Sequence, residues 1–208
     1  MFVTKLGHSC VLVETEDRVG LFDPGGWANR DLIDAIDHVD RIIYTHDHPD
    51  HFDIEILKSL LAKFPGAHVV CNNEIKEKIE QSGISTMVRG ETQCTRKFTS
   101  PHEDLPVPGA VAPAENGYHF KDLFTHPGDS YSFNEAKKVL AMPFVSPWGK
   151  IGDGIDLAIN LKPQYILPIH DWLYNDDSRE WLDGLLKTSL EKHGIEVLSS
   201  KSGIRHEI

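Results

Sequence analysis

Short hydrophobic runs separated by polar breaks mark the first fifty residues of the chain. Residues 2–6, 10–15 and 18–22 each carry such a run, a pattern that predicts three strands. Residues 41–45 (RIIYT) form a β-branched apolar run that is typical of a buried strand. A short helix is expected over residues 31–36. The beginning of the chain is therefore predicted to be rich in strands.

The spacing of apolar residues becomes helical at residue 53. Leucine and phenylalanine side chains between positions 57 and 64 fall on one face of a predicted helix over residues 53–64. An aspartate at its start can cap this helix, and a Pro-Gly pair after residue 64 stops it. A strand over residues 68–71 and a helix over residues 73–81 are expected to follow.

The second half alternates strands with helices. Residues 87–124 are strand-like but are interrupted by a loop rich in proline and alanine (DLPVPGAVAPAENG). Strands are predicted at 139–142 and 165–169 with a helix at 151–161 between them, and a last helix is predicted at 178–193. This order indicates a mixed α and β fold. No linker or change in composition divides the chain, so residues 1–208 are expected to form one domain.

Composition and charge exclude some partners. The formal net charge is -11, which disfavours binding to nucleic acid and to anionic membranes. A small anionic substrate stays compatible, since bound metal cations would dominate the local field. Three widely spaced cysteines, no apolar run long enough to span a membrane and no signal-like N-terminus predict a soluble, cytoplasmic protein.

The densest chemistry lies directly after the strand at 41–45, where residues 45–51 read THDHPDH. His46, His48, Asp50 and His51 place four potential ligands within six residues. Neutral imidazoles and carboxylates suit zinc, manganese or iron. Four such groups exceed what one catalytic ion needs from a single loop, because an open position must remain for water. The pattern therefore favours two ions that share a water, with further ligands from elsewhere in the chain.

This segment resembles the HxHxDH motif of the metallo-β-lactamase superfamily. Further segments fall in that family's order along the chain: FDPG at 22–25, HPGDS at 126–130 and LPIH at 167–170. The GHS segment at 7–9 and the compact size are most similar to the branch of ascorbate-phosphate lactonase-like and uncharacterised hydrolases. The resemblance implies an α+β fold, a four-layer αββα sandwich with the metal site at one edge between the two sheets.

The resemblance also implies a ligand set and a mechanism. It assigns His46 and His48 to the first ion, Asp50, His51 and His170 to the second, and Asp129 to both. Position along the chain favours His102 as the third histidine of the first ion, with His119 as the alternative. Two divalent ions, zinc before manganese or iron, would hold a hydroxide that Asp50 helps to orient.

Six other residues are candidates for supporting roles. Asp23, in the FDPG turn, is expected to accept a hydrogen bond from a ligand histidine and fix its tautomer. His8 is expected to face the site, as a supporting or a structural residue. His126 is a candidate substrate contact or proton donor, with a supporting or packing role as the alternative that the sequence slightly favours. Trp148, Phe144 and Trp27 are candidate walls of a substrate pocket.

The expected function is a metal-dependent hydrolase that cleaves a small ester, lactone or phosphoester with a metal-bound hydroxide. The alternative is a non-catalytic metal-binding or regulatory protein on the same fold. A nuclease is less favoured because of the negative charge. The sequence leaves the substrate and the oligomeric state open.

Overall fold

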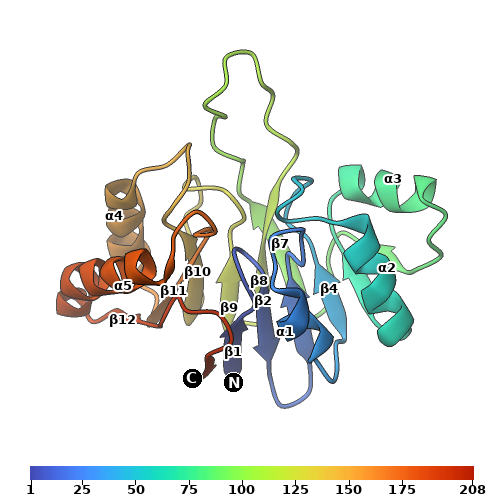
Figure 1. Ribbon diagram of the computed structural model, residues 1–208, viewed down its shortest axis with the longest axis horizontal. Coiled ribbons are helices and arrows are strands. Elements are labelled where there is room, and N and C mark those ends of the chain that lie inside the picture. The colour runs from blue at the N-terminus through green and yellow to red at the C-terminus, as the bar shows by residue number, and fades with distance from the viewer.

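A computed structural model describes residues 1–208 and shows two β-sheets packed against each other, with helices on both outer faces (Figure 1). The first sheet has the order β13-β1-β2-β3-β4-β5-β6 and the second the order β12-β11-β10-β9-β8-β7. The strands of the first sheet are β1 (Phe2–Lys5), β2 (Val11–Glu14), β3 (Val19–Phe22), β4 (Arg41–Ile43), β5 (His68–Val70), β6 (Val88–Arg89) and β13 (Arg205–Glu207). Those of the second are β7 (Thr95–Thr99), β8 (Asn116–Phe120), β9 (Phe124–His126), β10 (Val139–Pro143), β11 (Tyr165–Ile169) and β12 (Glu196–Val197).

The helices form the outer layers. The first sheet is covered by α1 (Arg30–Asp34), α2 (Ile54–Lys63) and α3 (Asn73–Gln81), and the second by α4 (Ile151–Leu161) and α5 (Asp176–Leu190), which continues into the 3-10 turn η1 (Glu191–His193). The predicted αββα sandwich is confirmed.

Three separate hydrophobic clusters hold the four layers together. Tyr44 and Leu57 belong to the cluster between the first sheet and its helices. Phe22 and Phe124 pack in the cluster between the two sheets, with ring centroids 5.0 Å apart. Leu186 of α5 lies in the third cluster, against the second sheet. Full burial of each such side chain contributes about 1.5–3 kcal/mol.

The helix boundaries follow their caps. The Asp53 side chain accepts hydrogen bonds from the backbone N–H groups of Glu55 and Ile56, so α2 begins one residue after its predicted start. Asn175 caps α5 in the same way, which starts that helix at Asp176 instead of 178. The last predicted turn is 3-10 helix and ends at Gly194, whose φ is 78°.

The C-terminal strands β12 and β13 were not predicted. Both are short edge strands, of two and three residues, and three of their five side chains are exposed. β13 pairs antiparallel with β1, and the guanidinium of Arg205 lies 3.3 Å from the ring centroid of Phe2. None of the helices combines the length and apolarity that a membrane crossing requires.

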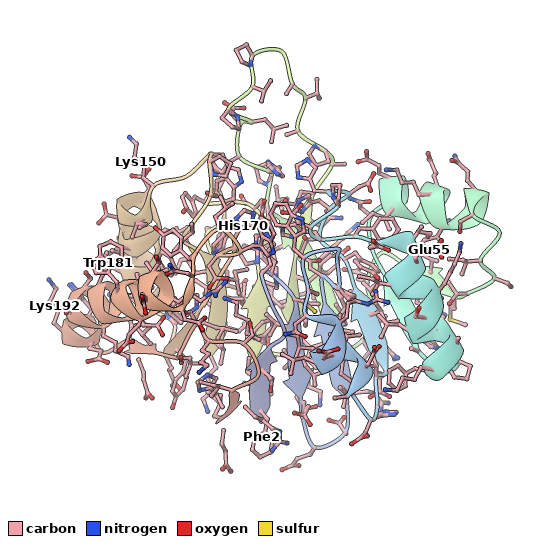
Figure 2. The ribbon with its side chains drawn as sticks, viewed as in Figure 1. Phe2, Glu55, Lys150, His170, Trp181 and Lys192 are labelled. Atoms are coloured by element: carbon pink, nitrogen blue, oxygen red, sulfur yellow. The ribbon has the colours of Figure 1, made fainter.

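Parallel pairing determines where the functional loops meet. β3, β4 and β5 are mutually parallel in the first sheet, as are β9, β10 and β11 in the second. Their carboxyl ends lie at one edge of the sandwich, where Figure 2 places His170 and from which the loop before β8 projects (Figures 1 and 2). Loops from both sheets therefore converge on this edge.

Candidate metal centre

Two groups of histidine and aspartate side chains lie together at this edge. One contains His46, His48, His102 and Asp129, and the other contains His8, Asp50, His51 and His170. Within each group the potential ligand atoms all lie within 4.8 Å of one another. We call them the first and the second cluster.

Hydrogen bonds on its far side hold the imidazole of His46 in the first cluster. His46 Nδ1 lies 3.0 Å from Thr45 Oγ1 and 2.9 Å from Glu115 Oε2. The Thr45 hydroxyl donates its proton to Asp23, so His46 Nδ1 is the donor and its Nε2 keeps a free lone pair. That Nε2 lies 3.2 Å from Nδ1 of His48. Two nitrogens are thus directed at one point.

The second cluster is held in the same manner. His51 Nδ1 lies 2.8 Å from Asp23 Oδ2, and His170 Nδ1 lies 2.7 Å from the carbonyl oxygen of Val145. Both therefore present Nε2 to the centre, at 3.2 Å and 3.0 Å from the two carboxylate oxygens of Asp129. Asp129 contacts both clusters and lies between them.

Several of these inward atoms are buried without a hydrogen-bond partner. They are His51 Nε2, His102 Nε2 and Asp129 Oδ1, of which the first and the last face each other at 3.2 Å without the geometry of a hydrogen bond. An unsatisfied buried polar atom costs about 1–3 kcal/mol, so three of them in one place need an explanation. A metal cation would bind all three, since neutral imidazole and carboxylate are its ligands of choice. The residues present therefore fit divalent metal ions.

Protonation differs between the clusters in the metal-free protein. Burial lowers the pKa of His46 and of His48. Burial also opposes charge on His51 and His170, but the Asp129 carboxylate outweighs it and raises the pKa of both. Burial would raise the pKa of Asp50, yet the hydrogen bond from His8 lowers it to about 2.

The loops that carry these residues are tightly constrained. His8, Asp23 and His170 have φ angles of 45°, 43° and 63°, which side chains with a Cβ seldom adopt. In the FDPG turn, a Cβ on Gly25 would lie 2.2 Å from the Asp50 carbonyl oxygen. The turn therefore needs glycine to pack against the loop at 46–51. Strained backbone of this kind persists where the surrounding structure fixes it.

A cavity of about 230 Å³ opens onto both clusters. His48, Asp50, His102, Asp129 and His170 line its floor. Typical small-molecule sites measure about 300–1,000 Å³, so this one suits a small ligand. The potential metal site is thus accessible to a substrate from one side.

Comparison with known proteins agrees with this geometry. The sequence model of the family described as "Beta-lactamase superfamily domain" matches residues 2–170. This chain belongs to the metallo-β-lactamase superfamily. Protein Rv0786c of Mycobacterium tuberculosis is 27% identical over 98% of this chain and 99% of its own length. The UPF0173 metal-dependent hydrolase NEQ378 of Nanoarchaeum equitans is 26% identical over 95% of both chains.

Solved structures share the fold. Igni18, a metallo hydrolase from Ignicoccus hospitalis, superposes with a TM-score of 0.70 at 16% identity, covering 100% of this chain and 98% of its own. The metallo-β-lactamase fold protein YhfI from Bacillus subtilis gives a TM-score of 0.66 at 16% identity, covering 99% and 98%. At this identity the likeness shows the sandwich alone.

Most of the residues expected from the superfamily motif meet at the edge. The third histidine beside His46 and His48 is His102. The alternative, His119, is buried in the second sheet, where its Nδ1 lies 2.9 Å from Thr125 Oγ1 and its ring stacks on Phe98. Asp23 accepts from His51 as expected, and His8 faces Asp50 at 3.0 Å. Trp27 and Trp148 line the cavity.

Two expectations need correction. His126 is fully buried: its Nε2 lies 2.9 Å from the carbonyl oxygen of Ser9, and its Nδ1 accepts from the N–H of Gly128. Both ring nitrogens are engaged away from the cavity, so His126 is a structural residue and not a proton donor to substrate. Phe144 is 1% exposed and packs in the third hydrophobic cluster, so it does not wall the pocket.

Sequence reasoning missed Glu115. Its carboxyl group is buried, lies 2.9 Å from His46 Nδ1 and accepts the backbone N–H of Asp129. Burial and the Asp129 carboxylate raise the pKa of Glu115. It lies at the end of a proline-rich loop with no periodic pattern. The one sequence signal was the glycine of HPGDS, because a Cβ on Gly128 would lie 2.6 Å from the Glu115 carboxyl carbon.

Proposed function

We propose that this protein is a hydrolase that uses two divalent metal ions to cleave a small ester, lactone or phosphoester. The observation that carries the proposal is the set of buried nitrogen and oxygen atoms that converge without hydrogen-bond partners at the floor of a cavity. The relatives named as metal-dependent hydrolases support it.

The proposed ligands follow the two clusters. His46, His48 and His102 would hold one ion, Asp50, His51 and His170 would hold the other, and Asp129, which contacts both clusters, would contribute to both. We favour zinc, because a set of imidazole and carboxylate ligands suits it, and manganese or iron would fit the same set. His8 supports Asp50 instead of binding metal: its Nδ1 accepts from the Trp172 N–H, which leaves Nε2 to donate.

When bound, such ions polarise the oxygen of the scissile group and lower the pKa of water from about 15.7 to near 7. Residues of the chain fix the ligands and orient the water. Asp23 and Glu115 fix the histidine orientations. Asp50, which is ionised at neutral pH and lines the cavity, accepts a hydrogen bond from the attacking water and orients it.

Metal content and turnover test the proposal together. Purified protein is analysed for metal and assayed on carboxylic esters, lactones and phosphoesters, alongside His48→Ala. We expect about two ions per chain and turnover that the substitution abolishes. His193→Ala, at an exposed helix end, is the matched control. Two bound ions without turnover would favour the non-catalytic alternative, and protein that binds no metal would refute both.

A further inference from the structure

No lysine, arginine, serine, threonine, asparagine, glutamine or tyrosine side chain lines the cavity over the two clusters. Each polar residue that lines it belongs to one of the two clusters. The remaining lining is apolar: two prolines together with Trp27, Trp148, Trp172, Leu105, Leu173 and Val145. Apart from the indole N–H groups of the tryptophans, a substrate bound here meets polar groups only in the two clusters.

The tryptophans give this wall a defined geometry. Trp27 and Trp172 stack with ring centroids 4.7 Å apart and are 39% and 51% exposed. Trp27 also lies edge-on to His8, at 4.9 Å between centroids. The ring centroid of Trp148 lies 5.5 Å from that of His170 and 6.1 Å from that of His102. Flat apolar surfaces therefore adjoin both clusters.

From this contrast we infer that the substrate is a small carboxylic ester or lactone that carries an aromatic or similarly flat apolar group. The inference rests on the proposed function and narrows it. Sites that bind phosphoesters commonly present arginine or lysine to the phosphate oxygens, and none lines this cavity. An apolar group that packs against the exposed tryptophan surface instead favours binding, because apolar surface on both sides is removed from water.

The reaction balances with water alone. A water oxygen forms a bond to the carbonyl carbon, and the ester C–O bond breaks. The leaving oxygen takes up one proton to become an alcohol, and the acid product loses the other at neutral pH to become a carboxylate.

Substrates that share one leaving group provide the test. Metal-loaded protein is assayed on p-nitrophenyl butyrate, p-nitrophenyl phosphate and bis-p-nitrophenyl phosphate, and on a phenyl-substituted γ-lactone with its methyl analogue. We expect higher kcat/KM on the ester and the phenyl lactone. Trp172→Ala should raise KM for the phenyl lactone by about twofold to tenfold with little change in kcat, since an aromatic contact contributes about 0.5–1.5 kcal/mol. Trp172→Phe should restore most of it.

Trp181→Ala is the matched control, because Trp181 is 58% exposed on α5 and does not line the cavity. The chain has four tryptophans, so in this variant every remaining one lines the cavity. Its intrinsic fluorescence then reports binding there directly. Phenylacetate should quench it at lower concentration than phenyl phosphate does.

The outcomes separate this inference from the proposed function. Preferred turnover of a phosphoester would overturn the inference and leave the hydrolase intact. An unchanged KM in Trp172→Ala, with a shift from dimer to monomer in sedimentation, would also overturn it and make the tryptophans an interface. No turnover of any substrate by protein with two bound metal ions would refute the proposed function, whatever the quenching shows.

Discussion

The two clusters at the edge of the sandwich are built differently. In the first, burial keeps His46 and His48 neutral by lowering their pKa, and Glu115 supports the ring of His46. In the second cluster, the Asp129 carboxylate raises the pKa of His51 and His170. Protonation of these histidines is therefore favoured when no metal ion is bound. The first cluster is ready to bind metal, whereas the second must exchange protons for it.

The largest effect is expected at the residue that both clusters share. Asp129→Ala removes the carboxylate that lies 3.2 Å from His51 Nε2 and 3.0 Å from His170 Nε2, and it also borders His102. Both ions should be lost or weakened by more than the roughly 10–100-fold that loss of a supporting residue costs. Elemental analysis and turnover measure this. Asp122→Ala, at an exposed aspartate, should change neither.

If Asp129→Ala removed one ion and left the other with its original affinity, Asp129 would belong to one cluster only. The two clusters would then be independent metal sites.

Substitutions of the supporting carboxylates should separate the clusters. Glu115→Gln should weaken the ion of the first cluster by about 10–100-fold. Asp23→Asn should weaken the ion of the second cluster by a similar factor and that of the first by less, because Asp23 reaches His46 only through the Thr45 hydroxyl. Asp23→Asn is expected to act through His51, whose Nδ1 lies 2.8 Å from the Asp23 carboxylate. Stepwise competition with a coloured chelator resolves the two affinities. Glu77→Gln, on the exposed face of α3, is the control.

Equal weakening of the same binding step by both substitutions would show that the clusters act as one unit. Loss of both steps in Glu115→Gln, with an unchanged melting temperature, would assign Glu115 a role wider than the support of His46.

The sequence was informative where chemistry and periodicity coincide. The apolar run at 41–45 ends where the ligand loop begins, so β4 and the position of His46 at the sheet edge followed from local pattern. The two helices at 73–81 and 151–161 have the predicted bounds.

Errors arose where a residue's environment depends on distant segments. His126 lies three positions before Asp129 but is the last residue of β9. Its side chain packs between the sheets against Phe22. Phe144 directly follows β10 and continues its burial, whereas its neighbour Val145 reaches the cavity. Glu115 gains its role only through contacts with His46 and Asp129, both far from it in sequence.

The smallest expected effect is a difference in proton release. Because the pKa of His51 is raised well above its ordinary value and that of His170 is also raised, metal uptake by the second cluster should release one proton or more, whereas uptake by the first cluster should release few. The affinity of the second ion should then fall at least about tenfold per pH unit as pH decreases from 7 to 6. Calorimetric titration in buffers of different ionisation enthalpy counts the protons. Equal proton release at both metal-binding steps would contradict the difference in protonation between the two clusters.

The same pKa shifts predict an opposite trend for the metal-free protein. A histidine whose folded pKa exceeds its unfolded value of 6.5 stabilises the fold fully below that pH, and the stabilisation is lost as pH rises through the folded pKa. Melting of chelator-treated protein should therefore shift to lower temperature as pH rises above about 6.5, while the metal-loaded protein gains stability over the same range. His51→Gln, which cannot hold the proton, should flatten the metal-free trend. An unaltered slope in that variant would assign the trend to another group, and His170→Gln would then test the second histidine whose pKa Asp129 raises.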